Sequence, residues 1–290
     1  MRVLKQVLDD YVERLKNNFI ENPERDVTLL LSYGLNIPVS ELHFRRDQLI
    51  SHNQLSRLNH LVYRRESNEP IAKIIGAKDF WKSRFLVTRA VLDPRPETEL
   101  LVETIINYTG KKKNILDLGT GSGCIAISLA LELPDVTVVG VDISKAALAI
   151  ARKNSLRNGA KVSFFQSNWF QNVSEKFDVI VSNPPYISES SYKKLPKDVK
   201  NFDPKVALTS GKDGLESYRK IAHSMYSFLK EGGVGFFEIG FGQKKSVIEI
   251  FSSARLFIVE VKQDLNGLDR VICVKKDAYI SRSAIDMKQA

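Results

Sequence analysis

The residues best suited to chemistry are Asn183, Pro184, Pro185 and Tyr186, which follow the apolar stretch Phe177–Ser182. That stretch is typical of a buried strand, and the two prolines predict that the chain leaves the sheet in a stiff, extended conformation. The Asn183 side-chain oxygen and the Pro184 carbonyl oxygen can accept hydrogen bonds, and the Tyr186 ring is flat. Two acceptors beside an aromatic face suit a planar NH2 group of an amide or an amino-base. The alternative is a turn that only ends a strand.

A second candidate site is the glycine-rich turn Asp117-Leu118-Gly119-Thr120-Gly121, which follows another stretch of strand type. Glycines let a ligand approach the backbone closely. Cys124 stands where a dinucleotide-binding fingerprint has its third glycine. Asp117 would repel a pyrophosphate, but it could pair with the cationic end of an amino acid. The turn therefore favours a ligand other than a dinucleotide.

Two more residues extend this second site. Asp142 follows the expected strand Val136–Val141 and is placed to accept hydrogen bonds from two ribose hydroxyls. Trp169, in the loop after the next strand, could pack on an adenine, or it could be an aromatic residue of the core. A nucleoside joined to a zwitterionic, sulfonium-bearing amino acid fits Asp117, Asp142 and Trp169 together. The pattern favours S-adenosylmethionine over NAD as the cofactor.

The two candidate sites together predict a reaction. Ligands of open α/β sheets bind at the carboxyl ends of the strands, around the switch in strand order. If Asn183 ends the strand beside the glycine-rich one, its side chain opens onto the methyl group of the cofactor. Asn183 and Pro184 would then hold a target nitrogen in line with the bond that breaks, and orientation is the main source of rate. No general base is evident in Asn183–Tyr186, so proton loss would follow methyl transfer.

Composition narrows the class of protein. The chain has 290 residues, is 43% hydrophobic and contains no apolar run of the ~18 residues that a membrane span needs. Its amphipathic, acidic start is unlike a signal peptide, so we expect a cytoplasmic protein. Two cysteines and four scattered histidines argue against a disulfide scaffold or a zinc site, so no metal is expected.

The net charge of +9 lies after residue 70, because residues 1–70 hold ten basic and ten acidic side chains. An acidic partner would therefore meet the second part of the chain. The alternative is that the basic surface only aids solubility.

The spacing of apolar residues divides the chain into parts. Residues 1–69 repeat apolar positions every three or four residues, which predicts a small helical bundle, either a substrate-docking module or a purely structural one. Residues 70–92 are rich in β-branched and aromatic residues, which predicts a β-hairpin linker around Gly76–Asp79. Strands and helices alternate in residues 93–276, so we expect a parallel, doubly wound sheet with helices on both faces. Residues 277–290 are expected to be a C-terminal tail.

With these motifs in place, the sequence resembles the bacterial release-factor glutamine methyltransferases of the HemK/PrmC type, from the helical start to the last strand. Asp117–Gly121 and Asn183–Tyr186 occur across many methyltransferases. The specific segments are Pro-Arg-Pro-Glu-Thr-Glu at Pro94–Glu99, Glu-Pro-Ile-Ala from Glu69, and Asp-Gly-Leu from Asp213. The other residues that carry the resemblance are Phe80-Trp81, Asp142, Asn168-Trp169-Phe170, Phe202-Asp203-Pro204, Ala207-Leu208, Tyr218-Arg219 and Glu238-Ile239-Gly240.

The resemblance implies a class I S-adenosylmethionine-dependent methyltransferase fold, with a Rossmann-like doubly wound sheet and a small N-terminal helical bundle. It implies methylation of the side-chain amide of the glutamine in the Gly-Gly-Gln motif of class 1 release factors. In that family, the positions of Asp117–Gly121, Asp142, Trp169 and Asn183 contact the cofactor. Asn183–Tyr186 hold the glutamine, and Asn183, Pro184 and Tyr186 are the expected catalytic residues.

Two positions depart from the family pattern. Asn168 stands where an acid is usual, and Asp93 stands where an aliphatic residue is usual. Neither residue takes part in the chemistry inferred above.

Class 1 release factors are the expected partners of a monomeric enzyme that forms no stable complex with nucleic acid and does not contact a membrane. One alternative is an adenine exocyclic-amine methyltransferase that acts on RNA or DNA by base flipping, because Asn183–Tyr186 would suit that amine equally well. Against it, the charge-balanced N-terminal part has no basic, aromatic face. Another alternative is a non-catalytic adaptor that binds S-adenosylmethionine, but an adaptor has no use for Asn183–Tyr186.

Overall fold

The computed structural model describes residues 1–276, so the expected tail at 277–290 lies outside the described residues. The chain forms two compact units. Among the described residues, the first comprises Met1–Ala77 and Pro196–Phe202, and the second comprises Lys78–Leu195 and residues 203–276. Within residues 1–276, every helix is too short or too polar to span a bilayer.

The first unit is a helical bundle, as the sequence predicts. Its elements are β1 (Arg2–Val3), α1 (Leu4–Asn17), α2 (Pro23–Leu35), α3 (Val39–Leu42), the 3-10 turn η1 (His43–Arg45), β2 (Leu49–Ile50), α4 (His52–Glu66), α5 (Ile71–Ile75) and α10 (Lys197–Phe202). Pro23 opens α2 at a position where no backbone N–H is needed. Ser51 and Gln54 form a capping box at the start of α4. The helices enclose one apolar core, which includes Leu4, Val7, Leu15, Val27, Leu30, Leu58 and Val62.

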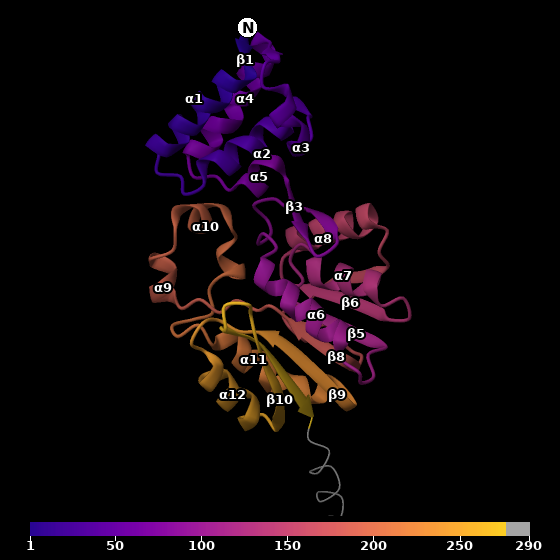
Figure 1. Cartoon of the computed structure of the whole chain (residues 1–290). Helices are drawn as coiled ribbons and strands as arrows, with labels where there is room; N and C mark the ends of the chain where they lie inside the picture. The colour runs from indigo at the N-terminus through magenta and orange to yellow at the C-terminus, as the bar shows by residue number, and fades with distance from the viewer. Residues whose placement is uncertain (277–290) are drawn as a thin grey trace, which may run out of the picture. The chain divides into compact units, whose positions relative to one another are not determined.

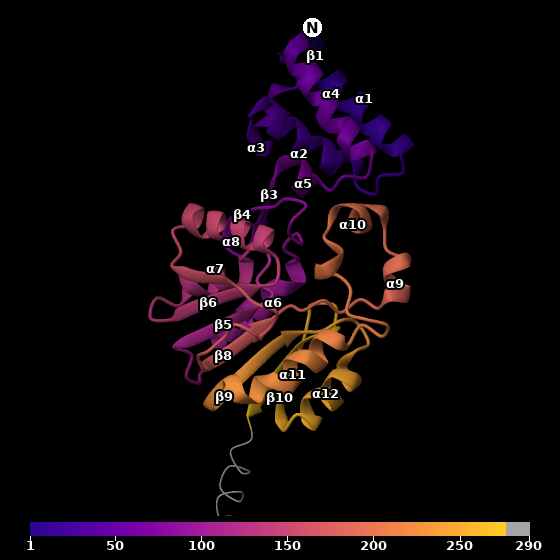
Figure 2. The same cartoon turned by 180° about the vertical axis from the view of Figure 1, so that it is seen from behind.

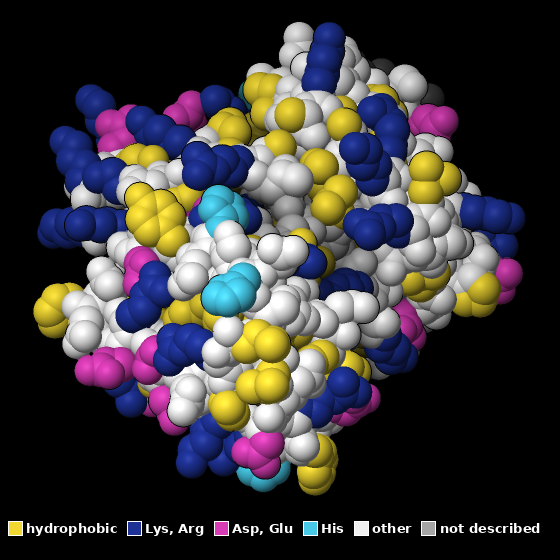
Figure 3. Space-filling view, turned by 90° about the horizontal axis from the view of Figure 1, so that it is seen from above, with side chains coloured by type: hydrophobic (Ala, Val, Ile, Leu, Met, Phe, Trp, Pro, Cys, Tyr) yellow, Lys and Arg dark blue, Asp and Glu magenta, His cyan; other side chains and the backbone are white. Residues whose placement is uncertain are grey.

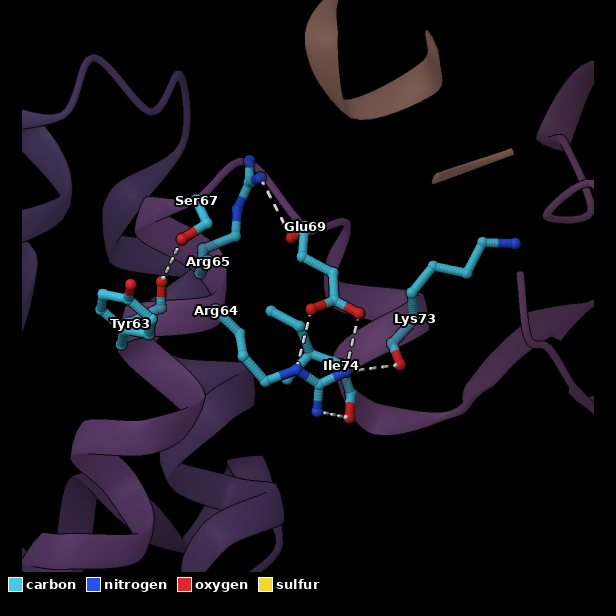
Figure 4. Close-up of polar contacts among 7 residues, drawn as sticks. All are labelled: Tyr63, Arg64, Arg65, Ser67, Glu69, Lys73 and Ile74. Carbon is cyan, nitrogen blue, oxygen red and sulfur yellow. Dashed lines mark hydrogen bonds and ion pairs between the residues drawn. The ribbon is translucent and has the colours of Figure 1, made fainter. Parts of the chain in front are cut away.

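A partly buried ion pair closes the end of α4 (Figure 4). Arg64 Nε and Nη2 donate to the two carboxylate oxygens of Glu69 at 2.8 and 2.7 Å. The same guanidinium donates to the carbonyl oxygens of Lys73 and Ile74 at 3.3 and 3.4 Å. Arg65 donates to the carbonyl oxygen of Glu69 at 3.3 Å. These bonds fix α5 to the end of α4.

The segment that was expected to begin the hairpin is the helix α5, so the prediction of a strand there was wrong. Pro70 sets the start of this helix, and Gly76 ends it in the left-handed conformation, at φ 75°, that glycine adopts without strain. Ile74 packs into the core of the bundle. The β-branched residues of this stretch therefore serve a short buried helix rather than a strand.

The hairpin itself lies later in the chain. It joins β3 (Ala77–Phe80) to β4 (Ser83–Leu86), and these two strands form a sheet of their own. The N-terminal segment of the first unit ends at Ala77, so the predicted linker at residues 70–92 is divided between the two units.

The second unit is built on a seven-stranded sheet of order β10-β11-β9-β8-β5-β6-β7. Its strands are β5 (Asn114–Leu118), β6 (Thr137–Asp142), β7 (Val162–Gln166), β8 (Phe177–Ser182), β9 (Leu229–Glu238), β10 (Leu256–Gln263) and β11 (Asp269–Lys276). Strands β5 to β9 pair in parallel, as predicted. Strand β11 is antiparallel to both β9 and β10, which corrects the expectation of a wholly parallel sheet. Residues 264–268 are too short for the crossover of a dozen or more residues that parallel strands need.

Helices cover both faces of this sheet, as the alternating pattern predicts. Figure 1 shows α6 (Glu99–Asn107), α7 (Cys124–Glu132) and α8 (Lys145–Asn158) on one face, and Figure 2 shows α11 (Glu216–Phe228) and α12 (Lys244–Ser253) on the other. Successive side chains of a strand point to opposite faces. Leu116 and Leu118 accordingly belong to the core beneath α11 and α12, and Ile115 belongs to the core beneath α6 and α7.

Three short elements complete the second unit. The 3-10 turn η2 (Pro96–Thr98) precedes α6, and α9 (Glu189–Lys193) and the 3-10 turn η3 (Lys205–Ala207) lie in the connection from β8 to α11. Cys124 and Cys273 are both buried and carry free thiols.

Candidate active site

Three strand ends meet at one edge of the large sheet. Strand β5 pairs in parallel with both β6 and β8, so Leu118, Asp142 and Ser182 end neighbouring strands. Strands β6 and β7 lie on one side of β5, and β8 and β9 lie on the other, so the strand order reverses between β5 and β8. Open α/β sheets bind their ligands at such a switch. The Ser182 hydroxyl donates to the Leu118 carbonyl at 2.6 Å and joins the two strand ends. Asn183 therefore follows the strand beside the glycine-rich one, as the predicted reaction requires.

The glycine-rich turn after β5 is held by hydrogen bonds on both sides. The N–H groups of Gly119 and Thr120 donate to the Val141 carbonyl at 2.8 and 2.9 Å. Gly119 and Gly121 have φ of 71° and 56°, where glycine avoids the strain that a side chain would cause. The Thr120 hydroxyl donates to Asp117 Oδ2 at 2.6 Å. The turn is therefore set in shape before any ligand arrives.

Asp117 is completely buried beneath this turn. Burial raises its pKa to about 7, although the Thr120 hydroxyl and the Ala126 N–H favour the ionised form and oppose the rise. Its second oxygen, Oδ1, accepts no hydrogen bond of good geometry from the described residues. Leaving a buried acceptor unsatisfied costs stability, and a cationic donor from a ligand would remove that cost.

Asp142 ties the glycine-rich turn to the end of β6. Its Oδ2 accepts from the Gly121 N–H at 2.9 Å, and its Oδ1 accepts from the Ser144 N–H at 2.8 Å. Burial raises the pKa of Asp142, and these backbone bonds lower it. Ser144 also caps α8, because its hydroxyl accepts from the Ala147 N–H at 3.2 Å. A carboxylate oxygen can accept more than one hydrogen bond, so the predicted ribose contact remains open to Asp142.

Trp169 lies beside the same turn. A Cβ atom added to Gly119 would be 3.8 Å from Trp169 Cζ3, and the half-buried indole also packs against the core beneath α11 and α12. Its φ of 52° is rare for a residue with a bulky side chain. The Ser167 hydroxyl supports this conformation by donating to the Trp169 carbonyl at 2.7 Å. The two interpretations of Trp169, a core residue and a wall of the ligand site, are thus compatible. Asn168, a departure from the family pattern, is exposed.

Asn183 is partly buried and leads into a chain of hydrogen bonds. Its Nδ2 donates to Thr98 Oγ1 at 3.0 Å. The Thr98 hydroxyl donates in turn to Glu238 Oε2, at the end of β9, at 2.7 Å. Burial raises the pKa of Glu238 to about 7, while the side chains of Thr98 and Asn183 favour its ionised form. Three segments that lie far apart in the sequence thus converge at the Asn183 side chain.

Burial and hydrogen bonds from neighbouring residues fix the three residues that follow Asn183. Pro184 is buried, and Pro185 and Tyr186 are partly buried. Gln243 Nε2 donates to the Tyr186 carbonyl at 2.9 Å, and Gln243 Oε1 accepts from the Gly240 N–H at 3.1 Å. Gly240 leaves room for the Tyr186 ring, since an added Cβ would be 2.9 Å from its Cδ2. Burial raises the pKa of the Tyr186 phenol above its ordinary value, so the group stays neutral near pH 7 and does not act as a base.

Sequence reasoning assigned no role to Thr98, Glu238 or Asn154. Thr98 and Glu238 lie in segments that carried the family resemblance, but neither segment shows from its sequence that it reaches Asn183. One signal was available for Glu238, which is an acid that directly follows the apolar residues Val234–Phe237 of a buried strand. Asn154 is fully buried, and its amide donates to the Ser122 carbonyl at 2.9 Å, just after the glycine-rich turn.

Comparison with known proteins places this site in a family. The methyltransferase small domain matches residues 88–198, and the PrmC N-terminal domain matches residues 6–76. A release factor glutamine methyltransferase of Geobacter sulfurreducens is 37% identical over 270 residues, which cover 93% of this chain and 95% of that protein. The chain belongs to the release factor glutamine methyltransferase family. Another member, from Buchnera aphidicola subsp. Schizaphis graminum, is 41% identical over 258 residues and covers 88% of this chain and 94% of its own.

Longer relatives and solved structures agree with this placement. A bifunctional methyltransferase of Rickettsia typhi is 37% identical over 93% of this chain and 56% of its own length, so the chain spans about half of that relative. A solved methyltransferase of Pyrococcus furiosus has a TM-score of 0.53 and 19% identity, and covers 76% of this chain and 98% of that chain. The second unit has the class I S-adenosylmethionine-dependent methyltransferase fold, which confirms the predicted α/β class.

Proposed function

We propose that the protein transfers a methyl group from S-adenosylmethionine to the side-chain amide nitrogen of the glutamine in the Gly-Gly-Gln motif of class 1 release factors. The observation that carries this proposal is the position of Asn183–Tyr186 at the end of β8, beside the glycine-rich turn that follows β5. Membership of the family supports the same substrate, because the relatives of similar length are named for release factor glutamine methylation.

The residues of the turn fit S-adenosylmethionine. No described residue donates a hydrogen bond of good geometry to Asp117 Oδ1, and the ammonium group of the cofactor would provide one. We assign the ribose hydroxyls to Asp142 and the adenine to Trp169. The cofactor would approach the backbone of Leu118–Gly121 closely. When bound, the cofactor supplies a methyl group on a positively charged sulfur.

Asn183 Oδ1 and the Pro184 carbonyl oxygen are assigned to the two hydrogens of the glutamine amide, and the Tyr186 ring to its flat face. Two bonded hydrogens hold the nitrogen in line with the methyl group and favour the positive charge that develops on it. The nitrogen forms the new bond to the methyl carbon, and the electron pair of the carbon–sulfur bond returns to sulfur. The nitrogen then loses one proton to solvent, which leaves N-methylglutamine and S-adenosylhomocysteine.

The alternative substrate is the amine of adenine in RNA or DNA. Within residues 1–70 the charges balance, which does not favour the basic surface that tracks a nucleic acid. On the face drawn in Figure 3, Lys and Arg side chains gather at the upper left and along the right side, with acidic side chains among them. Family membership also favours a protein substrate over a nucleic acid.

Incubation with S-adenosylmethionine that carries a labelled methyl group tests this choice. Purified release factor and RNA are offered separately, and each is analysed for label. We expect label in the release factor, on the glutamine of its Gly-Gly-Gln motif. Label in RNA alone would refute the proposed substrate.

For the first unit we propose a docking role, in a monomeric protein that acts in the cytoplasm where release factors work. The bundle contributes none of the residues assigned to the reaction, and remote contacts can hold a reacting group in place. Removing residues 1–76 should reduce methylation of the whole release factor far more than methylation of a short Gly-Gly-Gln peptide. Equal losses on both substrates would make the bundle a stability element only.

A further inference from the structure

The orientation of the Asn183 amide decides whether it can hold the substrate, because its two ends have opposite character. The oxygen accepts hydrogen bonds and the nitrogen donates them. A glutamine NH2 group needs an acceptor, so the Asn183 oxygen must face it and the nitrogen must face away. The inference that follows rests on the proposed function and concerns what enforces this orientation.

Glu238 and Thr98 enforce it through their donors and acceptors. An ionised carboxylate can only accept, so the bond of 2.7 Å between Thr98 Oγ1 and Glu238 Oε2 must use the Thr98 hydroxyl hydrogen. The Thr98 oxygen then has only lone pairs to offer to Asn183. The Asn183 atom that lies 3.0 Å from it must therefore be the nitrogen, Nδ2.

We propose that Thr98 and Glu238 are positioning residues that hold the Asn183 amide with its oxygen toward the substrate NH2 group. The site is built for this purpose: Glu238 is 2% exposed and Thr98 is 2% exposed, so water does not compete for their bonds. The bonded atoms come from η2, β9 and the end of β8, and each of these elements is fixed in the same compact unit.

Protonation of Glu238 removes the constraint on the orientation of the Asn183 amide. A neutral carboxyl can donate to Thr98, which frees the Thr98 hydrogen to bond the Asn183 oxygen and turns the amide around. Burial raises the pKa of Glu238 to about 7, so this change falls within an accessible pH range. The charged and titratable groups around Glu238 are Glu97, which raises its pKa, Arg270, which lowers it, and Tyr186, Tyr218 and Cys124, whose own pKa values burial raises.

The test measures single-turnover methylation of release factor at saturating S-adenosylmethionine between pH 5.5 and 9. Asp117 also has a pKa near 7, so the cofactor dissociation constant is measured at each pH and saturation is maintained. For the wild type we expect the rate to fall about tenfold per pH unit below the pKa of Glu238. Glu238→Gln should be slower at pH 8 and should lose this dependence, since an amide does not titrate.

Thr98→Val removes the hydroxyl that accepts from Asn183 and donates to Glu238, and it should slow the reaction on the order of tenfold to a hundredfold, with cofactor affinity changed less than twofold. Thr98→Ser keeps the hydroxyl and should restore both the rate and its pH dependence. Thr104→Val is the matched control, because that hydroxyl donates to the Leu100 carbonyl within α6, at 2.6 Å, and makes no other hydrogen bond among residues 1–276.

A Thr98→Val rate within twofold of the wild type would overturn the inference, as would a Glu238→Gln rate equal to that of the wild type at pH 8. If Glu238→Gln does not fold, the Val and Ser variants of Thr98 decide the question. If the wild type is active toward release factor and Thr98→Val loses no activity, the positioning role alone is refuted. A wild-type protein without any activity refutes the proposed function as well.

Discussion

At the scale of single residues, several polar side chains of this site serve the fold and the proposed chemistry at once. Asn183 is an example. From the sequence it is an acceptor at the end of a strand, and an Asp in its place would keep an acceptor. In the structure, Asn183 Nδ2 lies 3.0 Å from Thr98 Oγ1. The lone pairs of this Thr98 oxygen require a hydrogen-bond donor, and an ionised Asp has none. The proposed role of Asn183 therefore uses both the oxygen of its amide, as an acceptor for the substrate, and the nitrogen, as a donor to Thr98.

Asp142 combines the two roles in a measurable way. Asp142→Ala should weaken S-adenosylmethionine binding by about 1.5 to 3 kcal/mol for each hydroxyl bond lost to the charged carboxylate. It should also lower the melting temperature, because the Gly121 and Ser144 N–H groups lose their acceptor. Calorimetric titration and thermal unfolding measure the two effects, with Asp142→Asn as the control that keeps one oxygen. An unchanged dissociation constant would place the ribose elsewhere.

At the scale of elements, the strands around the site could be predicted because each is a short apolar run that ends at a glycine, an acid or Asn-Pro. The errors arose where local pattern and tertiary packing disagree. The β-branched run at Ile71–Ile75 is helical because it covers the bundle core. The direction of β11 depends on the length of residues 264–268, which alternation alone does not take into account.

Contacts between distant elements could not be predicted from either pattern. Asn154 of α8 accepts from the Leu86 N–H at 2.7 Å and donates to the carbonyls of Leu86 and Ser122 at 3.0 and 2.9 Å. In the sequence it is an ordinary polar residue of a helix. In the structure it fastens the hairpin strand β4 and the glycine-rich turn to α8.

Asn154→Ala should therefore destabilise the second unit by roughly 3 kcal/mol, because each of three lost hydrogen bonds contributes about 1 kcal/mol. Denaturant unfolding measures the change. Asn158→Ala, one turn further along α8, is the matched control and should cost less, since its side chain is more exposed and makes two hydrogen bonds within the described chain, to the carbonyls of Arg84 and Asn154. Equal effects of the two substitutions would contradict a special role for Asn154.

At the scale of the whole molecule, two buried carboxyl groups of the candidate site reduce the stability of the folded protein at alkaline pH. Burial raises the pKa of both Asp117 and Glu238 to about 7, whereas in the unfolded chain they ionise at ordinary, lower values. Between those limits the folded protein holds protons that the unfolded chain has released. The contribution of each group to stability is therefore present at low pH and is lost as the pH rises through 7.

Glu238→Gln removes one of the two groups that hold a proton in the folded protein and release it in the unfolded chain. We expect the free energy of unfolding of the wild type to fall between pH 5 and pH 8, and the variant to lack roughly 3 kcal/mol of that fall. Urea unfolding at both pH values measures the difference. The same dependence on pH in both proteins would show that Glu238 ionises normally in the folded state.

The fold class and the family could be recognised from the sequence, and the two segments proposed to bind ligands could be singled out, because each is carried by residues that are adjacent along the chain. The hydrogen bonds between distant residues that hold these segments in place could not be recognised. Thr98 and Glu238 are 140 residues apart, and only the folded sheet brings their side chains together.

The most direct test of the whole account is the single-turnover rate of Asn183→Ala on a release factor, with S-adenosylmethionine at saturation. The substitution removes one of the two acceptors assigned to the glutamine NH2 group. Loss of one such preorganised hydrogen bond typically lowers turnover by about 10² to 10³. We predict a loss of that size, with a much smaller change in cofactor affinity. A rate equal to that of the wild type would mean that Asn183–Tyr186 only ends a strand, and would contradict the proposed mechanism.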